Sequence, residues 1–347
     1  MTPVELYSAF RPLLFALPPE TAHRLAIHSL RTRAALRPLS SPLTVLPRQV
    51  MGLDFPNPVG LAAGFDKDAA DTDALATLGF GFLEVGAITP KPQLGNPSPR
   101  LFRLPQARAL INRMGFNNCG AEAAAQHLSH RRNRCIIGIN IGKNATTPLE
   151  NALDDYLYCL RSLYVQGDFF TINVSSPNTL GLQQLQQKDS LTRLLSALVT
   201  ERDALTKQHG KRSPLAVKLS SDLDETALQD AALAVRESGV DGVIATNTTS
   251  ERPAAIKHLA GANETGGLSG QPLAARATAM ITSLRTLLPK KTAIIGVGGI
   301  FSGDDAREKL SAGADLIQIY TGLIYEGPCL PCRILAELKT HPPAPTT

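Results

Sequence analysis

The chain has 347 residues, of which 43% are hydrophobic and 19% are charged, so its composition is that of a globular protein and excludes a disordered one. No apolar run approaches the roughly 20 residues of a membrane-spanning helix, and no secretory signal opens the chain. The formal net charge of +5 allows an anionic substrate, a lipid headgroup or RNA as a partner, and it selects none of these.

Residues 1–40 are predicted to form a small helical extension. Thr2-Pro3-Val4-Glu5 fits a capping box with proline at the first helical position, and a second helix is expected from Glu20 to about Ala35. A short, basic, amphipathic pair of helices fits a contact with a membrane surface, and it fits equally a cap buried on the rest of the protein. The residues concerned are Leu6, Phe10, Leu13, Leu14 and Leu17 on one apolar face, interrupted by Pro12, together with Arg11, Arg24, Arg31, Arg33 and Arg37.

Residues 41–340 are predicted to form one catalytic domain, because eight short apolar runs recur between about residues 58 and 325. Most are followed by a stretch with helical spacing, and continuous apolar runs are typical of parallel strands covered by helices. Eight such units favour a closed (β/α)8 TIM barrel over the alternative, an open doubly wound sheet. The runs are Val59–Ala63, Phe82–Ile88, Cys135–Ile141, Phe169–Val174, Leu215–Leu219, Gly242–Ala245, Ala293–Val297 and Leu316–Tyr320.

Polar residues and glycines gather just after these runs, where a barrel has its active site. The fourth run is the most informative, because it ends in Ser175-Ser176-Pro177-Asn178-Thr179, and Pro177 cannot continue a central strand. Small hydroxyl and amide side chains at the mouth of a rigid strand suit a flat ligand with several hydrogen-bonding groups. An ordinary turn is the alternative for this segment taken alone.

Two glycine-rich segments predict a phosphate site. Gly266 to Gly270 follows the sixth run, and Gly298-Gly299 follows the seventh, ahead of a helix expected near Ser302. Glycines let backbone N–H groups approach a phosphate, and loops after the last strands of a barrel often bind one. No P-loop motif and no strand-linked dinucleotide fingerprint is present.

The five cysteines do not indicate a disulfide framework or a metal site. Their number is odd, and Cys329 and Cys332 form a C-x-x-C without a second pair at zinc-like spacing. They are interpreted as incidental thiols in a reducing compartment, and no metal is expected.

Four motifs together resemble the dihydroorotate dehydrogenase family. They are 57–68 (NPVGLAAGFDKD), 110–118 (LINRMGFNN), 172–178 (INVSSPN) and 266–270 (GGLSG), and the likeness covers nearly the whole chain in matching order. Ser176 stands where the cytosolic class has cysteine, so the chain is similar to the membrane-associated, quinone-using class.

The resemblance implies an FMN-containing barrel that oxidises dihydroorotate to orotate in pyrimidine biosynthesis. Ser176 would be the catalytic base, with a proton relay through Thr179, since serine is a weak base. Ala87 stands where relatives often have a threonine that contacts FMN, so one hydrogen bond of about 1 kcal/mol is in question. The implied FMN residues are Ala62, Ala63, Gly64, Asp66, Ala87, Asn140, Asn173, Lys218, Thr246, Gly270, Gly299, Tyr320 and Thr321. The implied substrate residues are Lys67, Asn112, Arg113, Met114, Gly115, Phe116, Asn173, Asn178, Asn247 and Thr248.

The same class implies a quinone as electron acceptor, entering between the N-terminal helices near His23, Arg103 and Tyr320. The expected location is peripheral, on the cytoplasmic face of a bacterial inner membrane, without a nucleic-acid partner or an obligate protein partner. Alternatives are an FMN barrel with another substrate or with NAD or fumarate as acceptor, an RNA-acting flavin reductase, and a phosphate-binding scaffold. The spread of the basic residues disfavours RNA, and the amide-rich constellation disfavours the scaffold.

Overall fold

The computed structural model describes residues 3–36 and 45–342. Thr2 of the expected capping box, Arg37 and the boundary predicted at residue 40 lie outside the described residues. The two predicted N-terminal helices are confirmed as α1 (Pro3–Ala16), which continues through Pro12, and α2 (Pro19–Leu36).

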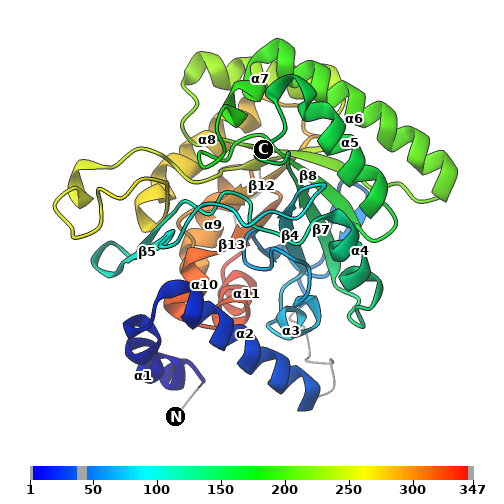
Figure 1. The fold of residues 1–347 in the computed structure, drawn as a ribbon. Coiled ribbons are helices and arrows are strands. Elements are labelled where there is room, and N and C mark those ends of the chain that lie inside the picture. The colour runs from blue at the N-terminus through cyan, green and yellow to red at the C-terminus, as the bar shows by residue number, and fades with distance from the viewer. Residues whose placement is uncertain (1–2, 37–44, 343–347) are drawn as a thin grey trace.

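Eight parallel strands close into a barrel, which confirms the predicted fold (Figure 1). Each strand lies within one of the eight apolar runs and differs from it by at most two residues at one end. The strands are β3 (Val59–Leu61), β4 (Phe82–Ile88), β7 (Ile136–Ile141), β8 (Phe169–Asn173), β9 (Leu215–Leu219), β10 (Gly242–Ala245), β12 (Ala293–Val297) and β13 (Leu316–Ile319).

Helices cover the outside of the barrel, and their buried apolar residues pack on the outward side of the strands. The helices are α3 (Thr72–Ala76), α4 (Ala121–Ser129), α5 (Ala152–Leu163), α6 (Lys188–His209), α7 (Glu225–Ser238), α8 (Ala274–Leu287), α9 (Gly303–Ser311), α10 (Thr321–Glu326) and α11 (Leu330–Thr340). Short 3-10 turns are η1 (Pro105–Ala107), η2 (Leu149–Asn151), η3 (Leu182–Gln186), η4 (Ala254–Ile256) and η5 (Gln271–Leu273).

Aromatic rings fill the barrel interior at the end where the strands begin. The ring of Phe82 lies 5.2 Å from that of Phe55 and 6.0 Å from that of Phe169. Gly60 makes room for it, since a Cβ there would lie 2.2 Å from the Phe82 ring. Phe55 belongs to a hairpin, β1 (Arg48–Val50) and β2 (Leu53–Phe55), that the sequence analysis did not predict. These rings occupy the N-terminal end of the interior, and the cavity lies at the opposite, C-terminal end.

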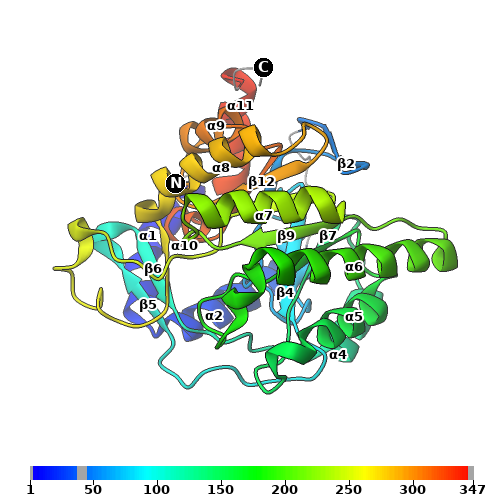
Figure 2. The same cartoon turned by 90° about the horizontal axis from the view of Figure 1, so that it is seen from above.

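A second unpredicted sheet stands beside the C-terminal end of the barrel (Figure 2). The connection from β4 to α4 supplies β5 (Leu101–Leu104) and β6 (Ala109–Asn112), and the connection from β10 to α8 supplies β11 (Gly267–Gly270). These strands pair antiparallel in the order β11-β6-β5. Gly270 has φ +98°, and a Cβ there would lie 2.3 Å from the Arg108 carbonyl oxygen, so the close pairing requires glycine.

The N-terminal helices dock on the side of the barrel (Figure 1). On α1, the Tyr7 hydroxyl donates to the Ile324 carbonyl at 2.6 Å, and the Arg11 guanidinium donates to the Tyr325 carbonyl at 2.9 Å. On α2, Glu20 forms an ion pair with Arg100 at 2.9 Å. Among the helices of the described residues, none is long and apolar enough to cross a membrane.

Candidate active site

A cavity opens at the C-terminal ends of the barrel strands, roofed by β6 and β11. Most of the residues that the resemblance implied lie around it. Those that line it are Ala62, Ala63, Gly64, Lys67, Ala87, Asn112, Met114, Gly115, Phe116, Asn173, Ser176, Asn178, Lys218, Thr246, Asn247, Thr248, Gly270, Gly299, Tyr320 and Thr321.

Ser176 lies on the turn directly after β8, and only 6% of it is exposed. Its Oγ accepts a hydrogen bond from the Asn178 backbone N–H at 3.3 Å. That bond stabilises negative charge on Oγ and so favours loss of the hydroxyl proton. Thr179 is buried nearby, but within the described chain it forms no hydrogen bond with Ser176, so the relay through Thr179 stays a prediction.

Four asparagine side chains converge from three strands or the turns that follow them, β6, β8 and β10. Asn178 Nδ2 donates to Asn112 Oδ1 at 3.1 Å, and Asn112 Nδ2 donates to the Gly267 carbonyl at 3.3 Å. Asn247 Nδ2 lies 3.5 Å from Asn173 Oδ1. Each amide offers both donors and an acceptor, so the group matches a ring with alternating carbonyl and N–H groups.

Lys67 adds a cation to the same wall of the cavity. Its Nζ donates to the Gly64 carbonyl at 2.6 Å. Burial lowers the pKa of Lys67 to about 8, although the nearby Glu20 carboxylate opposes the shift. The ammonium is therefore charged at neutral pH and poised to bind a carboxylate.

The inner part of the cavity fits a flavin ring. Lys218 is buried, lines the cavity and has no hydrogen-bond acceptor in the described part of the protein; burial lowers its pKa. Gln318 also lines it, and its Oε1 is buried without a partner among the described residues. A buried cation without a hydrogen-bond acceptor and a buried acceptor without a donor favour a polar ligand beside them. FMN would meet both requirements through its ring carbonyl and N–H groups.

The outer end of the cavity fits a phosphate. The hydroxyls of Ser269 and Thr321 lie 2.8 Å apart, and helix α10 begins at Thr321, so its first N–H groups have no acceptor within the helix. Gly299 has φ +72°, and a Cβ there would lie 2.4 Å from Ala274 Cβ. The hydroxyl groups and the free backbone N–H groups can therefore donate to a phosphate, and no apolar side chain blocks them.

Three implied site residues lie outside the lining of the cavity. Asp66 accepts hydrogen bonds from the backbone N–H groups of Ala70 and Asp71, and burial raises its pKa to about 6, so it shapes the loop after β3. Arg113 pairs with Glu264 at 2.6 Å and points away from the cavity. Asn140 lies behind Asn173, and its Oδ1 accepts a hydrogen bond from Asn173 Nδ2 at 3.0 Å.

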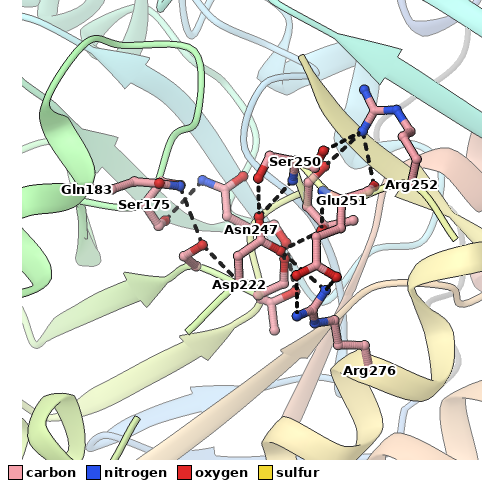
Figure 3. Close-up of polar contacts among 12 residues, drawn as sticks. Ser175, Gln183, Asp222, Asn247, Ser250, Glu251, Arg252 and Arg276 are labelled. Carbon is pink, nitrogen blue, oxygen red and sulfur yellow. Dashed lines mark hydrogen bonds and ion pairs between the residues drawn. The ribbon is translucent and has the colours of Figure 1, made fainter. Parts of the chain in front are cut away.

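The loop that carries Asn247 is anchored on both sides (Figure 3). Asp222, on the loop after β9, accepts from the backbone N–H of Ser250 at 2.7 Å and from its hydroxyl at 2.6 Å. Burial raises the pKa of Asp222, but the hydrogen bonds outweigh burial and hold it below its usual value. On the other side, Asn247 Nδ2 donates to Ser175 Oγ at 3.0 Å. The Asn247 amide is therefore held before any ligand binds.

A second cavity lies between α2, the loop after β3 and β5, and all three expected quinone residues line it. The His23 ring packs edge-to-face on Phe65 at 4.8 Å, and burial lowers the pKa of His23 to about 4, so it is neutral at physiological pH. Arg103 donates to the Leu17 carbonyl at 2.8 Å. The two cavities share the residues Lys67, Leu101, Leu110, Met114 and Tyr320.

Two polar residues inside the barrel, Gln318 and the buried Glu84, were not predicted from the sequence. An available signal was the alternation along each strand, because Gln318 is two residues before Tyr320 and must face the same side. Within residues 3–36 and 45–342, no group of three His, Cys, Asp or Glu side chains could hold a metal ion, and all five cysteines are free.

Comparisons with known proteins identify similar chains. Residues 45–341 match the family model described as dihydroorotate dehydrogenase. A protein from Methylococcus capsulatus named dihydroorotate dehydrogenase (quinone) is 54% identical over 331 residues, covering 94% of this chain and 96% of the relative. One of the same name from Chromobacterium violaceum is 54% identical over 326 residues, covering 93% and 94%.

A solved structure is also similar to this chain over most of its length. The crystal structure of DHODH from Eimeria tenella in complex with ferulenol has a TM-score of 0.85 and 39% sequence identity, covering 94% of this chain and 93% of that chain. Family model, relatives and fold coincide over the barrel that holds Ser176 and the asparagine cluster. The chain therefore belongs to the dihydroorotate dehydrogenase family.

Proposed function

We propose that this protein is a quinone-dependent dihydroorotate dehydrogenase that carries FMN and acts in pyrimidine biosynthesis. The observation that carries the proposal is a cavity with two chemically different parts. One part holds Ser176 and an asparagine cluster, and the other holds the buried cation Lys218 and the orphaned acceptor of Gln318. The relatives named for the quinone reaction share more than half of their residues with this chain.

Each group of residues in the cavity would have a different role in the reaction. Asn112, Asn173, Asn178 and Asn247 would bind the ring edges of dihydroorotate, and Lys67 would bind its carboxylate. Ser176 would take the proton from the ring carbon, with negative charge on its Oγ stabilised by the Asn178 N–H. Lys218 would face the negative charge of the reduced cofactor. FMN, when bound, would accept the hydride from dihydroorotate and pass electrons to the quinone.

The second cavity supports a quinone route. It meets the first at Tyr320, and its walls include the apolar residues Phe65, Leu14 and Phe15. The neutral state of His23 suits an uncharged quinone, since a buried cation would be costly beside an apolar ring. Arg103 can offer donors from the same wall, although two of them already serve carbonyls of α1 and the turn that follows it.

The membrane contact rests on α1. Leu6, Phe10 and Leu13 share one face and are 48%, 54% and 66% exposed. They do not pack on the barrel, so this face supports the membrane reading of the extension over the buried cap. The cytoplasmic side of a bacterial membrane remains the proposed location.

An absorbance experiment tests the proposed function as a whole. The purified protein is expected to show a flavin spectrum that bleaches when dihydroorotate is added without oxygen and returns when a ubiquinone analogue follows. Flavin that stays oxidised would show that the substrate is different. Reoxidation by NAD or fumarate but not by quinone would move the protein to another acceptor class, and absence of flavin even after FMN is added would exclude the proposal.

The affinity for orotate is expected to fall above about pH 8. Lys67 has a pKa of about 8, so its ammonium is present below that pH and lost above it. Because the charge binds the carboxylate, the dissociation constant should rise by up to about tenfold per pH unit on the alkaline side. Flavin-absorbance titrations with orotate from pH 6 to 10 measure it. Lys67→Arg stays protonated and should flatten the profile; a persisting slope would assign the titration to another group.

A further inference from the structure

A buried carboxylate lies at the floor of the active-site cavity and belongs to none of the roles above. Glu84, on β4, is 0% exposed. One carboxylate oxygen accepts a hydrogen bond from Asn140 Nδ2 on β7 at 2.6 Å, and the other accepts from Gln318 Nε2 on β13. Glu84 thus bridges three strands of the barrel directly below the cavity.

An ionised carboxylate can only accept hydrogen bonds, so it determines which way each neighbouring amide faces. With its NH2 group on Glu84, Asn140 must turn Oδ1 the other way, where it accepts from Asn173 Nδ2 at 3.0 Å. Asn173 must then present its own Oδ1, which accepts from the Ser175 hydroxyl at 3.3 Å and faces Asn247 Nδ2. The Glu84 acceptor thus determines the direction of the Asn140 amide. Backbone N–H groups hold the next two amides in the same directions, since Ser175 donates to Asn173 Oδ1 at 3.3 Å and Thr248 donates to Asn247 Oδ1 at 2.8 Å.

The same carboxylate orients the amide on its other side. Gln318, which lines the cavity, directs Nε2 to Glu84, so its Oε1 takes the other direction, where it is buried without a partner in the described part of the chain. The charge of Glu84 also faces Lys218, which sits beside Asn173 in the register of β8 and β9. Glu84 is positioned to act on both parts of the cavity at once.

We propose that Glu84 is a positioning residue of this site: it sets the donor and acceptor directions of Asn140 and Gln318, it supports that of Asn173 through Asn140, and its charge partly offsets that of Lys218. Gln318 Oε1 is then a cofactor contact that accepts an N–H of the flavin. The inference rests on the proposed flavin site.

Glu84→Gln tests the proposal because it keeps the shape of the side chain while removing the charge. The new NH2 group must face either Asn140 or Gln318, so one of the two amides has to turn over or lose its bond. Two changes are expected. The dissociation constant for orotate should rise at least tenfold, and the two-electron reduction of the bound flavin should become about tenfold more favourable, equivalent to about 30 mV. The potential is measured at pH 6 to keep Lys218 protonated.

Thr171→Val is the matched control. Thr171 is on β8, two residues before Asn173, so it faces the same interior, and it is 0% exposed. Its Oγ1 has no partner among the described residues, and valine has nearly the same shape. This variant should leave both the orotate dissociation constant and the flavin potential within twofold of the unmodified protein.

If Glu84→Gln matches Thr171→Val in both measurements, the proposal is overturned. If Glu84→Gln yields no soluble protein, the variant Gln318→Leu tests the proposal in its place. This variant keeps the hydrogen bonds from Glu84 through Asn140 to Asn173, so the dissociation constant for orotate should stay within twofold. FMN should bind at least fivefold more weakly, because the Gln318 contact is lost. Unchanged FMN binding would overturn the proposal. Absence of flavin from the unmodified protein would instead count against the proposed function, so the two failures are distinguishable.

Discussion

Replacing Ser176 with alanine is expected to leave FMN bound and to slow flavin reduction by dihydroorotate by about three orders of magnitude. The substitution removes the Ser176 hydroxyl, the proposed base, which lines the cavity together with the asparagine cluster, and general base catalysis contributes about 10²- to 10⁴-fold. No large change in FMN affinity is expected, because Ser176 is not among the residues expected to contact FMN. Anaerobic stopped-flow absorbance at a saturating dihydroorotate concentration measures the reduction step alone.

Ser175→Ala is the control for this result. Ser175 is the neighbouring residue and fully buried, but its hydroxyl bonds to Asn247 and Asn173 within the protein. Its loss should weaken dihydroorotate binding by about tenfold, the worth of one hydrogen bond, with a smaller effect on the saturated rate. Near-normal reduction by Ser176→Ala, or equal losses in the two variants, would remove Ser176 from the role of base.

The triple change Leu6→Ser, Phe10→Ser and Leu13→Ser is expected to weaken membrane binding by about 100-fold or more. Each side chain buries apolar area worth about 1.5–3 kcal/mol when fully transferred from water, and an interfacial helix transfers part of it. Flavin reduction by dihydroorotate should be unchanged, because this face does not touch the barrel. Co-sedimentation with phospholipid vesicles measures the binding, and turnover with a vesicle-embedded quinone should fall with it.

Val165→Ser provides the matched control for the membrane experiment. Val165 is 59% exposed, and it follows α5 at the end of the barrel opposite the cavity. Its replacement should leave vesicle binding within twofold. Equal binding of the triple variant and the unmodified protein would favour the other interpretation of the extension, in which these helices only cap the barrel.

The barrel itself was accessible from the sequence because each of its strands is buried on both faces. Such a strand must be apolar over its whole length, so it is visible as a run, and the helix-length spacing between runs leaves few topologies. Short strands gave no comparable signal. β5 and β6 have four residues each, and β11, which pairs with β6, lies more than 150 residues further along the chain.

Sequence motifs identified the loops that carry the site, but they did not show which side chains face the ligand. Asp66 and Arg113 belong to motifs that surround the cavity, yet one bonds to its own loop and the other to Glu264. Gln318 lies within an apolar run and was not predicted as a site residue, although it lines the cavity. The direction of a side chain depends on register and on neighbouring strands, which local sequence does not encode.

By itself, the sequence determined the barrel, the identity of the polar residues at its strand ends and the family, since apolar periodicity and long motifs are local properties. Only the tertiary structure decided that two cavities meet at Tyr320, that β6 and β11 roof the site, and that Glu84 accepts hydrogen bonds from Asn140 and Gln318. Each of these features joins residues distant in the chain. They exist only when the barrel closes and brings β13 beside β3, and with it β4.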